Sequence, residues 1–502
     1  MRRSARAFRS RWPVESRWCP LRPGVRSTWS IPAGPAGCIR PVICPCCEMR
    51  CAISRAMLAS DQRWGHVRAS RFCIARGNRS AMNSSPTTQP HGPSKRSRDS
   101  AHQTPDEGVR MRIAQVANFY GPLSGGLRTA MHRLGIGYRE AGHDSLLIVP
   151  GPSTQVSEEP WGTVVTIASP RLPRSGGYRV ITDIDAVVTH LQAFGTQRLE
   201  VSDRVTLRSL GWWARARGIP SVFWAHERVD GVLRAHGGRF LPARRLADHW
   251  NAATARRFDR IVATTAFAAE EFSRIGVDTD RVPLGVDLQS FRPDRRDLDA
   301  RAQLLEPNQD VLLVSCTRLS REKRPDLAWE TLRELRRRGV RARLVLAGSG
   351  PMLDEARAVA RHLPMTVLGH VSDRDDLATL LASADVAIAP GPIETFGLAA
   401  LEALASGTPV VASRTSALRE IVRGAAGHAA APTPRALAEA VRAVLGRPQD
   451  GCRRAARNRA EEFPWSRTVD TMLALHGLDT GRGLVRERGS GREQGSDREL
   501  VP

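Results

Sequence analysis

Short apolar runs alternate with longer amphipathic stretches along most of the chain after residue 110. Each run is short enough for a strand and is bounded by polar or glycine-containing segments, as buried strands are. In the first half these runs cover residues 112–117, 145–150, 198–203, 221–226 and 260–265. Residues 125–142, between the first two runs, carry apolar side chains at helical spacing. The alternation predicts a parallel sheet with crossover helices.

The same alternation begins again after residues 282–293, where Pro283, Gly285 and Pro293 interrupt it. Proline and glycine at this density favour a linker. Beyond it, strands are predicted at 311–316, 342–350, 365–370, 385–390 and 408–413. The predicted fold class is α/β, with two Rossmann-like, doubly wound domains that face each other across a cleft. Such sheets bind ligands beyond the carboxyl ends of their strands.

The two ends of the chain differ in composition from this body. Residues 1–110 are basic, hold seven of the nine cysteines and lack periodicity, whereas Met111 opens a segment typical of a first strand. We expect this leader to be disordered, or to be upstream sequence translated from an early start codon. The polar, glycine-rich end is expected to be a disordered tail. The predicted divisions are a leader (1–110), an N-terminal domain (111–287), a linker (288–310), a C-terminal domain (311–452), helices (453–478) and the tail (479–502).

A net charge of +24 would suit a nucleic-acid-binding protein. Residues 1–110 hold 20 Lys and Arg against 6 Asp and Glu, however, so more than half of the excess lies in the leader. The body is therefore not expected to bind nucleic acid. No apolar run is long enough for a membrane-spanning helix or a secretory signal. Cys316 and Cys452 lie far apart without a pairing pattern, which fits a reducing cytosol.

Two glutamates frame a largely apolar segment in the second half of the chain. Glu394 lies in the loop after a predicted strand, and Glu402 lies eight positions further on, within a predicted helix. The backbone amides of Phe396, Gly397 and Leu398 open this helix, which makes them suited to a phosphate or a sugar hydroxyl. A carboxylate can accept hydrogen bonds from two vicinal hydroxyls. A sugar at one end and a ribose at the other would therefore explain both glutamates.

This E-x7-E pattern resembles the signature of the retaining glycosyltransferases of family 4, which have the GT-B fold. The resemblance implies that Glu394 contacts the transferred sugar and that Glu402 binds the ribose of the nucleotide. It covers residues 111–475, nearly the whole predicted body. The competing interpretation is a glutamate that interacts with a helix dipole, next to an ordinary exposed one.

The resemblance extends to two cations and two glycines in the second half. Arg318 and Lys323 follow its first strand and resemble the family's pair that neutralises the pyrophosphate of the donor. Such preorganised cations stabilise the leaving group as its charge develops. Without this context, they would be solvated surface charges. Gly348 and Gly350 match the family's G-x-G turn near the nucleotide, although a lone "GSG" is a weak signal.

In the first half, Gly125 and Gly126 stand where the first strand passes into the first helix. Residues without side chains allow backbone amides to approach a phosphate or sugar closely, although a plain turn would also favour them. His226 ends the predicted strand at 221–226. The resemblance implies that it binds the transferred sugar or assists attack by the acceptor. A solitary histidine is more often structural, but a strand's carboxyl end favours the functional interpretation.

Two patterns suggest metal sites but fit them poorly. The four cysteines between residues 44 and 51 lack the paired C-x2-C spacing of a structural zinc site. D-x-D pairs begin at Asp183, Asp278, Asp297 and Asp373, but none follows a buried strand as in metal-dependent sugar transferases. Chance explains them better. Since Arg318 and Lys323 would act as the cation, no essential metal and no cofactor are expected.

Longer segments, such as 115–130 and 381–411, resemble more narrowly the family's mannosyltransferases that elongate phosphatidylinositol mannosides. This implies GDP-mannose as donor, a phosphatidylinositol mannoside lipid as acceptor, and a peripheral position on the cytoplasmic face of the plasma membrane. Such a position requires basic and aromatic residues at the surface. A half-buried, half-solvated helix would look similar. The candidates are Arg208, Trp212, Trp213, Arg215, Arg217, Arg244 and Arg245.

Three alternatives stay open at this point. A family 4 enzyme could use another nucleotide sugar, such as UDP-glucose, or a soluble acceptor, because motifs around the pyrophosphate do not separate GDP from UDP. A nucleotide-sugar epimerase could share the two-domain frame, but it would act without an acceptor. A nucleic-acid-binding protein is the remaining class, and it requires a steep salt dependence of binding.

Overall fold

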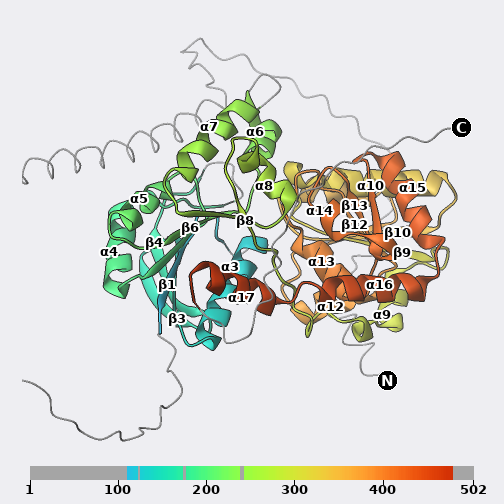
Figure 1. Cartoon of the computed structure of the whole chain (residues 1–502). Coiled ribbons are helices and arrows are strands. Elements are labelled where there is room, and N and C mark those ends of the chain that lie inside the picture. Colours follow the sequence, from blue (N-terminus) through green and yellow to red (C-terminus); the bar gives the residue numbers. More distant parts are fainter. Residues whose placement is uncertain (1–109, 122–124, 173–176, 238–241, 479–502) are drawn as a thin grey trace, which may run out of the picture.

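The computed structural model describes residues 110–121, 125–172, 177–237 and 242–478, so the predictions for the leader and the tail fall outside the described residues. The described chain forms two α/β domains that lie side by side (Figure 1). Each is built on a mainly parallel sheet with helices on both faces. The predicted fold class is confirmed.

The N-terminal domain contains an eight-stranded sheet in the order β3-β4-β2-β1-β5-β6-β7-β8. Neighbouring strands are parallel except for the hairpin of β3 and β4. The strands are β1 (Arg112–Val116), β2 (Asp144–Gly151), β3 (Gln155–Glu159), β4 (Gly162–Ala168), β5 (Arg198–Val201), β6 (Ser221–Ala225), β7 (Arg260–Ala263) and β8 (Asp280–Arg281). The helices are α3 (Gly126–Glu140), α4 (Ile184–Phe194), α5 (Leu210–Arg215), α6 (Val229–Gly237), α7 (Ala243–Ala255) and α8 (Ala266–Ser273).

The C-terminal domain contains a six-stranded, fully parallel sheet in the order β11-β10-β9-β12-β13-β14. The strands are β9 (Val311–Cys316), β10 (Ala342–Ala347), β11 (Met365–Gly369), β12 (Val386–Ala389), β13 (Val410–Ser413) and β14 (Gly427–Ala430). The helices are α9 (Leu298–Leu304), α10 (Pro325–Arg337), α11 (Leu353–Ala360), α12 (Arg374–Ser383), α13 (Leu398–Ala405), α14 (Leu418–Ile421), α15 (Pro434–Leu445) and α16 (Gln449–Glu461).

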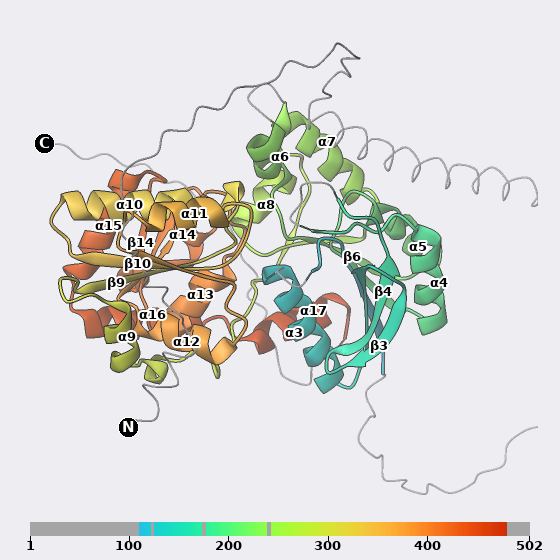
Figure 2. The same ribbon diagram turned by 180° about the vertical axis from the view of Figure 1, so that it is seen from behind.

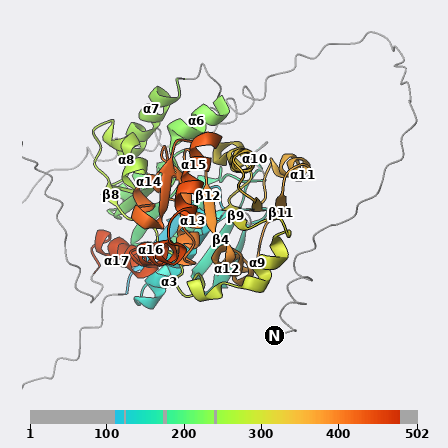
Figure 3. The ribbon, with the colours of Figure 1, turned by 90° about the vertical axis from the view of Figure 1, so that its right-hand side faces the viewer.

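Two apolar layers cover the C-terminal sheet. Helices α10, α11 and α15 pack on one face, while α12, α13 and α16 pack on the other (Figure 3). The buried strands are rich in Val, Leu, Ile and Ala, as expected where both faces of a parallel sheet are covered. This arrangement leaves the carboxyl ends of β9, β10 and β12 to be connected by loops, which carry the predicted site residues.

Three strand regions lack the apolar runs on which the sequence prediction relied. Strand β3 is largely exposed and forms an antiparallel hairpin with β4 at the edge of its sheet. Strand β8 has two residues, and β14 has the sequence "GHAA". Edge strands need only one neighbour and bury little surface, so their sequences carry little hydrophobic signal.

The C-terminal helix α17 (Trp465–Leu475) returns to the N-terminal domain, where it lies beside α3 (Figures 1 and 2). A bridge between Val286 and Pro464 marks the crossing, and the Thr468 hydroxyl donates to the Pro283 carbonyl at 2.9 Å. At Gly137 in α3, a Cβ atom would lie 2.3 Å from Val469 Cγ2. The two domains are therefore connected twice, by the linker and by this helix.

We predict that Gly137→Ala destabilises the protein, because the added methyl group would collide with Val469 in α17. Overpacking of this kind typically costs about 1–3 kcal/mol, which exceeds the gain of about 1 kcal/mol in helix propensity. Gly451→Ala in α16 is the matched control, because nothing lies within 4 Å of its Cβ position. Denaturant unfolding of both variants measures the difference, and equal stabilities would contradict the close packing.

Candidate active site

Loops from three adjacent strands of the C-terminal sheet carry most of the predicted site residues. Arg318 and Lys323 follow β9, Gly348 and Gly350 follow β10, and Glu394 follows β12. Strand β9 pairs with both β10 and β12. Since the strands are parallel, the three loops emerge at one edge of the sheet. This edge forms contacts with the N-terminal domain, and we call the region the interdomain junction.

Two of the predicted site residues, Lys323 and Glu394, are in direct contact. Lys323 Nζ donates to Glu394 Oε2 at 2.6 Å, and each side chain is 23% exposed. The backbone of Glu394 is also fixed, because its carbonyl accepts from the Ala417 amide at 2.9 Å. A cation and a carboxylate, 71 residues apart in sequence, thus share one partly buried position.

Arg318 lies at the same junction, against the ring of Tyr178 from the N-terminal domain. The guanidinium carbon is 5.2 Å from the ring centre, within the range of a cation–π contact. Burial raises the pKa of Tyr178, although the charge of Arg318 opposes this, so its hydroxyl stays protonated at neutral pH. Sequence reasoning missed Tyr178, because a single tyrosine between strands gives no periodic or motif signal.

Gly348 and Gly350 hold the β10 loop against the β9 loop. Their φ angles are +151° and +156°, and a Cβ atom would lie 1.8 Å from the Thr317 carbonyl and 2.5 Å from the Leu319 carbonyl, respectively. Only glycine fits at this separation. These contacts give both glycines a packing role in positioning the segment that carries Arg318, and their predicted role at the nucleotide stays a prediction.

Helix α13 begins at the predicted anion-binding turn. Gly397 caps it with φ +90°, where a Cβ atom would lie 2.6 Å from the Leu418 side chain and 3.2 Å from Glu394 Cγ. The Phe396 ring is buried and lies edge-on to Phe463, so its side chain belongs to the core. Any contact of Phe396 with a ligand would therefore be made by its backbone.

The N-terminal domain brings its predicted glycines to the same place. Gly125 and Gly126 are exposed at the start of α3, and the Cβ position of Gly126 lies 3.8 Å from Leu398 Cδ1 at the start of α13. The amino ends of two helices from different domains thus face each other. The two segments that the sequence analysis proposed separately for a phosphate or sugar therefore lie close together, and their role in binding stays a prediction.

His226 follows β6, and its ring stacks on that of Trp224 with centroids 5.0 Å apart and planes 6° apart. Burial lowers the pKa of His226 to about 4, against the opposing charge of Glu200. The imidazole is therefore neutral at physiological pH, and it can exchange hydrogen bonds but does not supply positive charge.

Glu402 lies further along α13, and its side chain is 15% exposed. Burial raises its pKa to about 7, although the Arg374 guanidinium, 3.8 Å from Oε1, opposes the shift. Burial, with the Glu402 charge, also raises the pKa of the Cys316 thiol at the end of β9 to about 12. Arg374 gave no signal in the sequence, because it stands in an ordinary polar first turn of α12.

The D-x-D pairs have structural explanations. Asp183, Asp297 and Asp373 are N-caps whose carboxylates accept from backbone amides at the starts of α4, α9 and α12. Aspartate is among the preferred residues at this position. Asp280, in the remaining pair, forms an ion pair with Arg260. Within the described ranges, no three His, Cys, Asp or Glu side chains gather in a group that could hold a metal ion.

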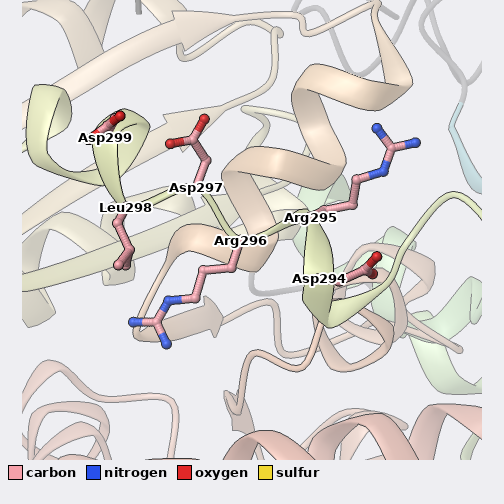
Figure 4. A pocket seen from close by; sticks show the side chains of 6 residues that line it. All are labelled: Asp294, Arg295, Arg296, Asp297, Leu298 and Asp299. Atoms are coloured by element: carbon pink, nitrogen blue, oxygen red, sulfur yellow. The ribbon is translucent and has the colours of Figure 1, made fainter. Parts of the chain in front are cut away.

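A surface pocket elsewhere is lined by Asp294–Asp299, a single segment of chain. Figure 4 shows that its labelled side chains point in different directions. Arg295 pairs with Asp375 at 3.0 Å, and Asp297 caps α9. None of the predicted site residues lines this pocket, and Arg295 and Asp297 are engaged in structural contacts.

Two Rossmann-like domains that meet at one junction are the arrangement of the GT-B fold of glycosyltransferases. Residues 125–285 match the family model described as "Glycosyl transferase 4-like domain", and residues 297–462 match "Glycosyl transferases group 1". The chain belongs to this family of glycosyltransferases, and it is therefore an enzyme of the glycosyltransferase class.

Individual relatives support the assignment. The chain is 50% identical over 372 residues to the "GDP-mannose-dependent alpha-(1-6)-phosphatidylinositol dimannoside mannosyltransferase" of Mycobacterium tuberculosis, a match that covers 73% of this chain and 96% of the relative. It is 34% identical over 303 residues to a "D-inositol 3-phosphate glycosyltransferase" of Saccharomonospora viridis, covering 53% and 67% of the two chains. Sucrose-phosphate synthase from Thermosynechococcus elongatus has the same fold, with a TM-score of 0.61, 20% identity, and coverage of 73% and 98%.

We predict that ionisation of Glu402 makes the protein less stable above neutral pH. Its folded pKa of about 7 exceeds the ordinary value of 4.5, so its contribution is complete below pH 4.5 and is lost as the pH rises through about 7. The loss is on the order of 3 kcal/mol at most. Since Glu402→Gln cannot ionise, it should gain stability relative to the wild type between about pH 5 and about pH 8.

Denaturant unfolding at both ends of this pH range measures the effect. Glu439→Gln in α15 is the matched control, because that carboxyl is half exposed, and it should show no such gain. A constant difference between wild type and Glu402→Gln would contradict the raised pKa.

Proposed function

We propose that the protein transfers mannose from GDP-mannose to a phosphatidylinositol dimannoside, forming an α-1,6 linkage and giving the trimannoside. The identity of 50% with the mycobacterial mannosyltransferase, over 96% of that relative, carries the choice of donor and acceptor. The Lys323–Glu394 pair at the interdomain junction supports the chemistry, because it joins one group suited to phosphate and one suited to sugar hydroxyls.

In the proposed reaction, the bond between the mannose anomeric carbon and the phosphate oxygen breaks, and a bond to an acceptor hydroxyl oxygen forms. The electron pair of the broken bond leaves with GDP, and the proton of the acceptor hydroxyl passes to the departing phosphate. Attack on the face that the phosphate leaves retains the anomeric configuration. Arg318 and Lys323 stabilise the developing phosphate charge, so no metal or cofactor is required.

The remaining residues orient the substrates in this proposal. Glu394 accepts hydrogen bonds from mannose hydroxyls, and Glu402 accepts them from the ribose. The neutral His226 exchanges a hydrogen bond with the sugar or the acceptor. The amides at the start of α13 and the glycines at the start of α3 contribute N–H donors to the phosphate or sugar.

We predict that Glu394→Gln and Arg318→Ala each reduce mannose transfer by at least about a hundredfold while the fold stays intact, because charge stabilisation is lost. Transfer is measured with radiolabelled GDP-mannose and purified phosphatidylinositol dimannoside. Glu439→Gln and Arg341→Ala are the matched controls, since both residues form exposed ion pairs in other parts of the C-terminal domain. Near-normal activity in both site variants would overturn the site assignment.

The same assay distinguishes the alternatives. Transfer from UDP-glucose instead of GDP-mannose would favour another member of the family, and transfer to free sugars would favour a soluble acceptor. Turnover of the sugar nucleotide without any acceptor would favour an epimerase. A chelator is expected to leave the rate unchanged. Salt-sensitive binding of the full chain to DNA would support the nucleic-acid alternative.

The lipid acceptor requires contact with a membrane surface, and we propose a peripheral position on the cytoplasmic face. Every helix in the described part of the chain is too short or too polar to span a bilayer. Trp213 and Arg208 are buried, so these two candidates do not reach the surface. Trp212 is 38% exposed beside Arg257, near the end of α7, and Arg244 and Arg245 are exposed in the first turn of that helix.

We predict that reversing the charge of both arginines, with Arg244→Glu and Arg245→Glu, weakens binding of the full chain to vesicles that contain phosphatidylinositol. Each lost cation removes about 1 kcal/mol of attraction to an anionic surface. The adjacent pair Arg336→Glu and Arg337→Glu at the end of α10 is the matched control. Co-sedimentation with and without phosphatidylinositol measures binding, and equal effects of the two double variants would contradict a specific surface.

A further inference from the structure

Thr395, the residue after Glu394, is held by the opposite domain. Its hydroxyl donates to the His226 carbonyl at 2.5 Å. Its own carbonyl accepts from the Thr264 hydroxyl at 3.1 Å and from the Thr265 hydroxyl at 2.8 Å. Both polar groups that Thr395 offers here are therefore bound to loops that follow β6 and β7 of the N-terminal domain.

The direction of these hydrogen bonds is fixed by the surroundings. The Thr265 oxygen accepts from the Ala268 amide as the N-cap of α8, so its hydrogen is free to be donated to Thr395. The Thr395 hydroxyl is a donor, because the His226 carbonyl can only accept. A threonine side chain provides both a donor and an acceptor, whereas valine of the same shape provides neither.

Glu394 itself is held by its own domain. Its carboxylate accepts from Lys323, and its carbonyl accepts from the Ala417 amide. The domains also meet at Glu420 of the C-terminal domain. Its two carboxylate oxygens accept from the Ala266 and Phe267 amides of the N-terminal domain at 2.9 and 2.8 Å. Two consecutive residues, Glu394 and Thr395, are thus held by different domains.

We propose that Thr395 is a positioning residue for sugar transfer, which fixes Glu394 of one domain relative to His226 of the other. Glu394 and His226, the two groups assigned to the sugar, come from different domains. Thr395 is covalently joined to Glu394, and its hydroxyl donates to the backbone carbonyl of His226. All three of its hydrogen bonds described above cross from one domain to the other. This inference rests on the proposed function, because it is tested by the rate of sugar transfer, but it does not depend on which sugar nucleotide is used.

The test compares Thr395→Val with Thr395→Ser in steady-state kinetics of the full chain. Valine keeps the shape and removes the hydroxyl, so we expect kcat to fall by about tenfold to a hundredfold, as expected for a small misplacement of a sugar-binding group. The KM for the donor should change little, because the pyrophosphate contacts stay in place. Serine retains the hydroxyl and should restore kcat to near the wild-type value.

Thr264→Val gives a second measurement, because it removes one of the two hydroxyl donors to the Thr395 carbonyl without changing the loop that carries Glu394. The double variant with Thr395→Val should lose less than the product of the two single losses, since both act on one contact. Thr189→Val in α4 is the matched control, because its hydroxyl bonds only within the helix, to the Asp185 carbonyl at 2.9 Å.

The two hypotheses fail in different ways. If the wild type transfers no mannose but uses another sugar nucleotide, the proposed substrate is wrong, and the same variants are compared with that donor. If the wild type is active and Thr395→Val matches it, the inference is overturned. It is also overturned if Thr395→Ser is impaired as much as Thr395→Val, or if the loss appears only in donor KM. If a Thr395 variant fails to fold, the kcat of Thr264→Val relative to the wild type decides the test in its place.

Discussion

The salt bridge between Lys323 and Glu394 determines how the loops of the C-terminal domain meet. Strands β9 and β12 are neighbours, so the loops that follow them emerge side by side, and a Cβ atom on Gly391 would lie 3.3 Å from the Lys323 carbonyl. Each charged side chain is 23% exposed, and either one alone would be an uncompensated charge in a partly desolvated position. A group suited to phosphate and a group suited to sugar are therefore placed together by one pairing.

In the N-terminal domain, several elements are held together by a different buried charge, the carboxylate of Glu200. The carboxylate of Glu200 in β5 accepts from Gln115, Tyr138 and Trp224, and it pairs with His476, which follows α17. Burial alone would raise its pKa, but these hydrogen bonds outweigh burial and lower it. The same carboxylate thus anchors the returning C-terminal helix and, through Trp224, orients the ring on which His226 stacks. The interdomain junction is consequently linked to the segment that follows α17.

Much of the fold could be predicted from the sequence, because buried parallel strands require apolar runs. The runs at 112–117 and 311–316, for example, correspond to β1 and β9. The motifs also predicted that Glu394 and Lys323 would lie in one region, and the structure places them in contact, whereas their roles stay a prediction. Tyr178, Arg374 and Thr395 were not, since each matters through a contact between segments far apart in sequence. A one-dimensional pattern does not record such contacts, nor does it record the return of α17.

A glycine in a loop can be required by close packing as well as by ligand binding, and the sequence pattern does not separate these two causes. Gly348 and Gly350 lack side chains because two loops pack against each other, whereas Gly125 and Gly126 are exposed beside the start of α13. No described atom lies closer than 3.8 Å to the Cβ positions of the latter two, so packing against the described residues does not require glycine there. Burial meanwhile keeps His226 neutral and draws Glu402 toward neutrality at physiological pH. In the proposed reaction, the positive charge for the departing phosphate comes from Arg318, placed against Tyr178, and from Lys323, which pairs with Glu394.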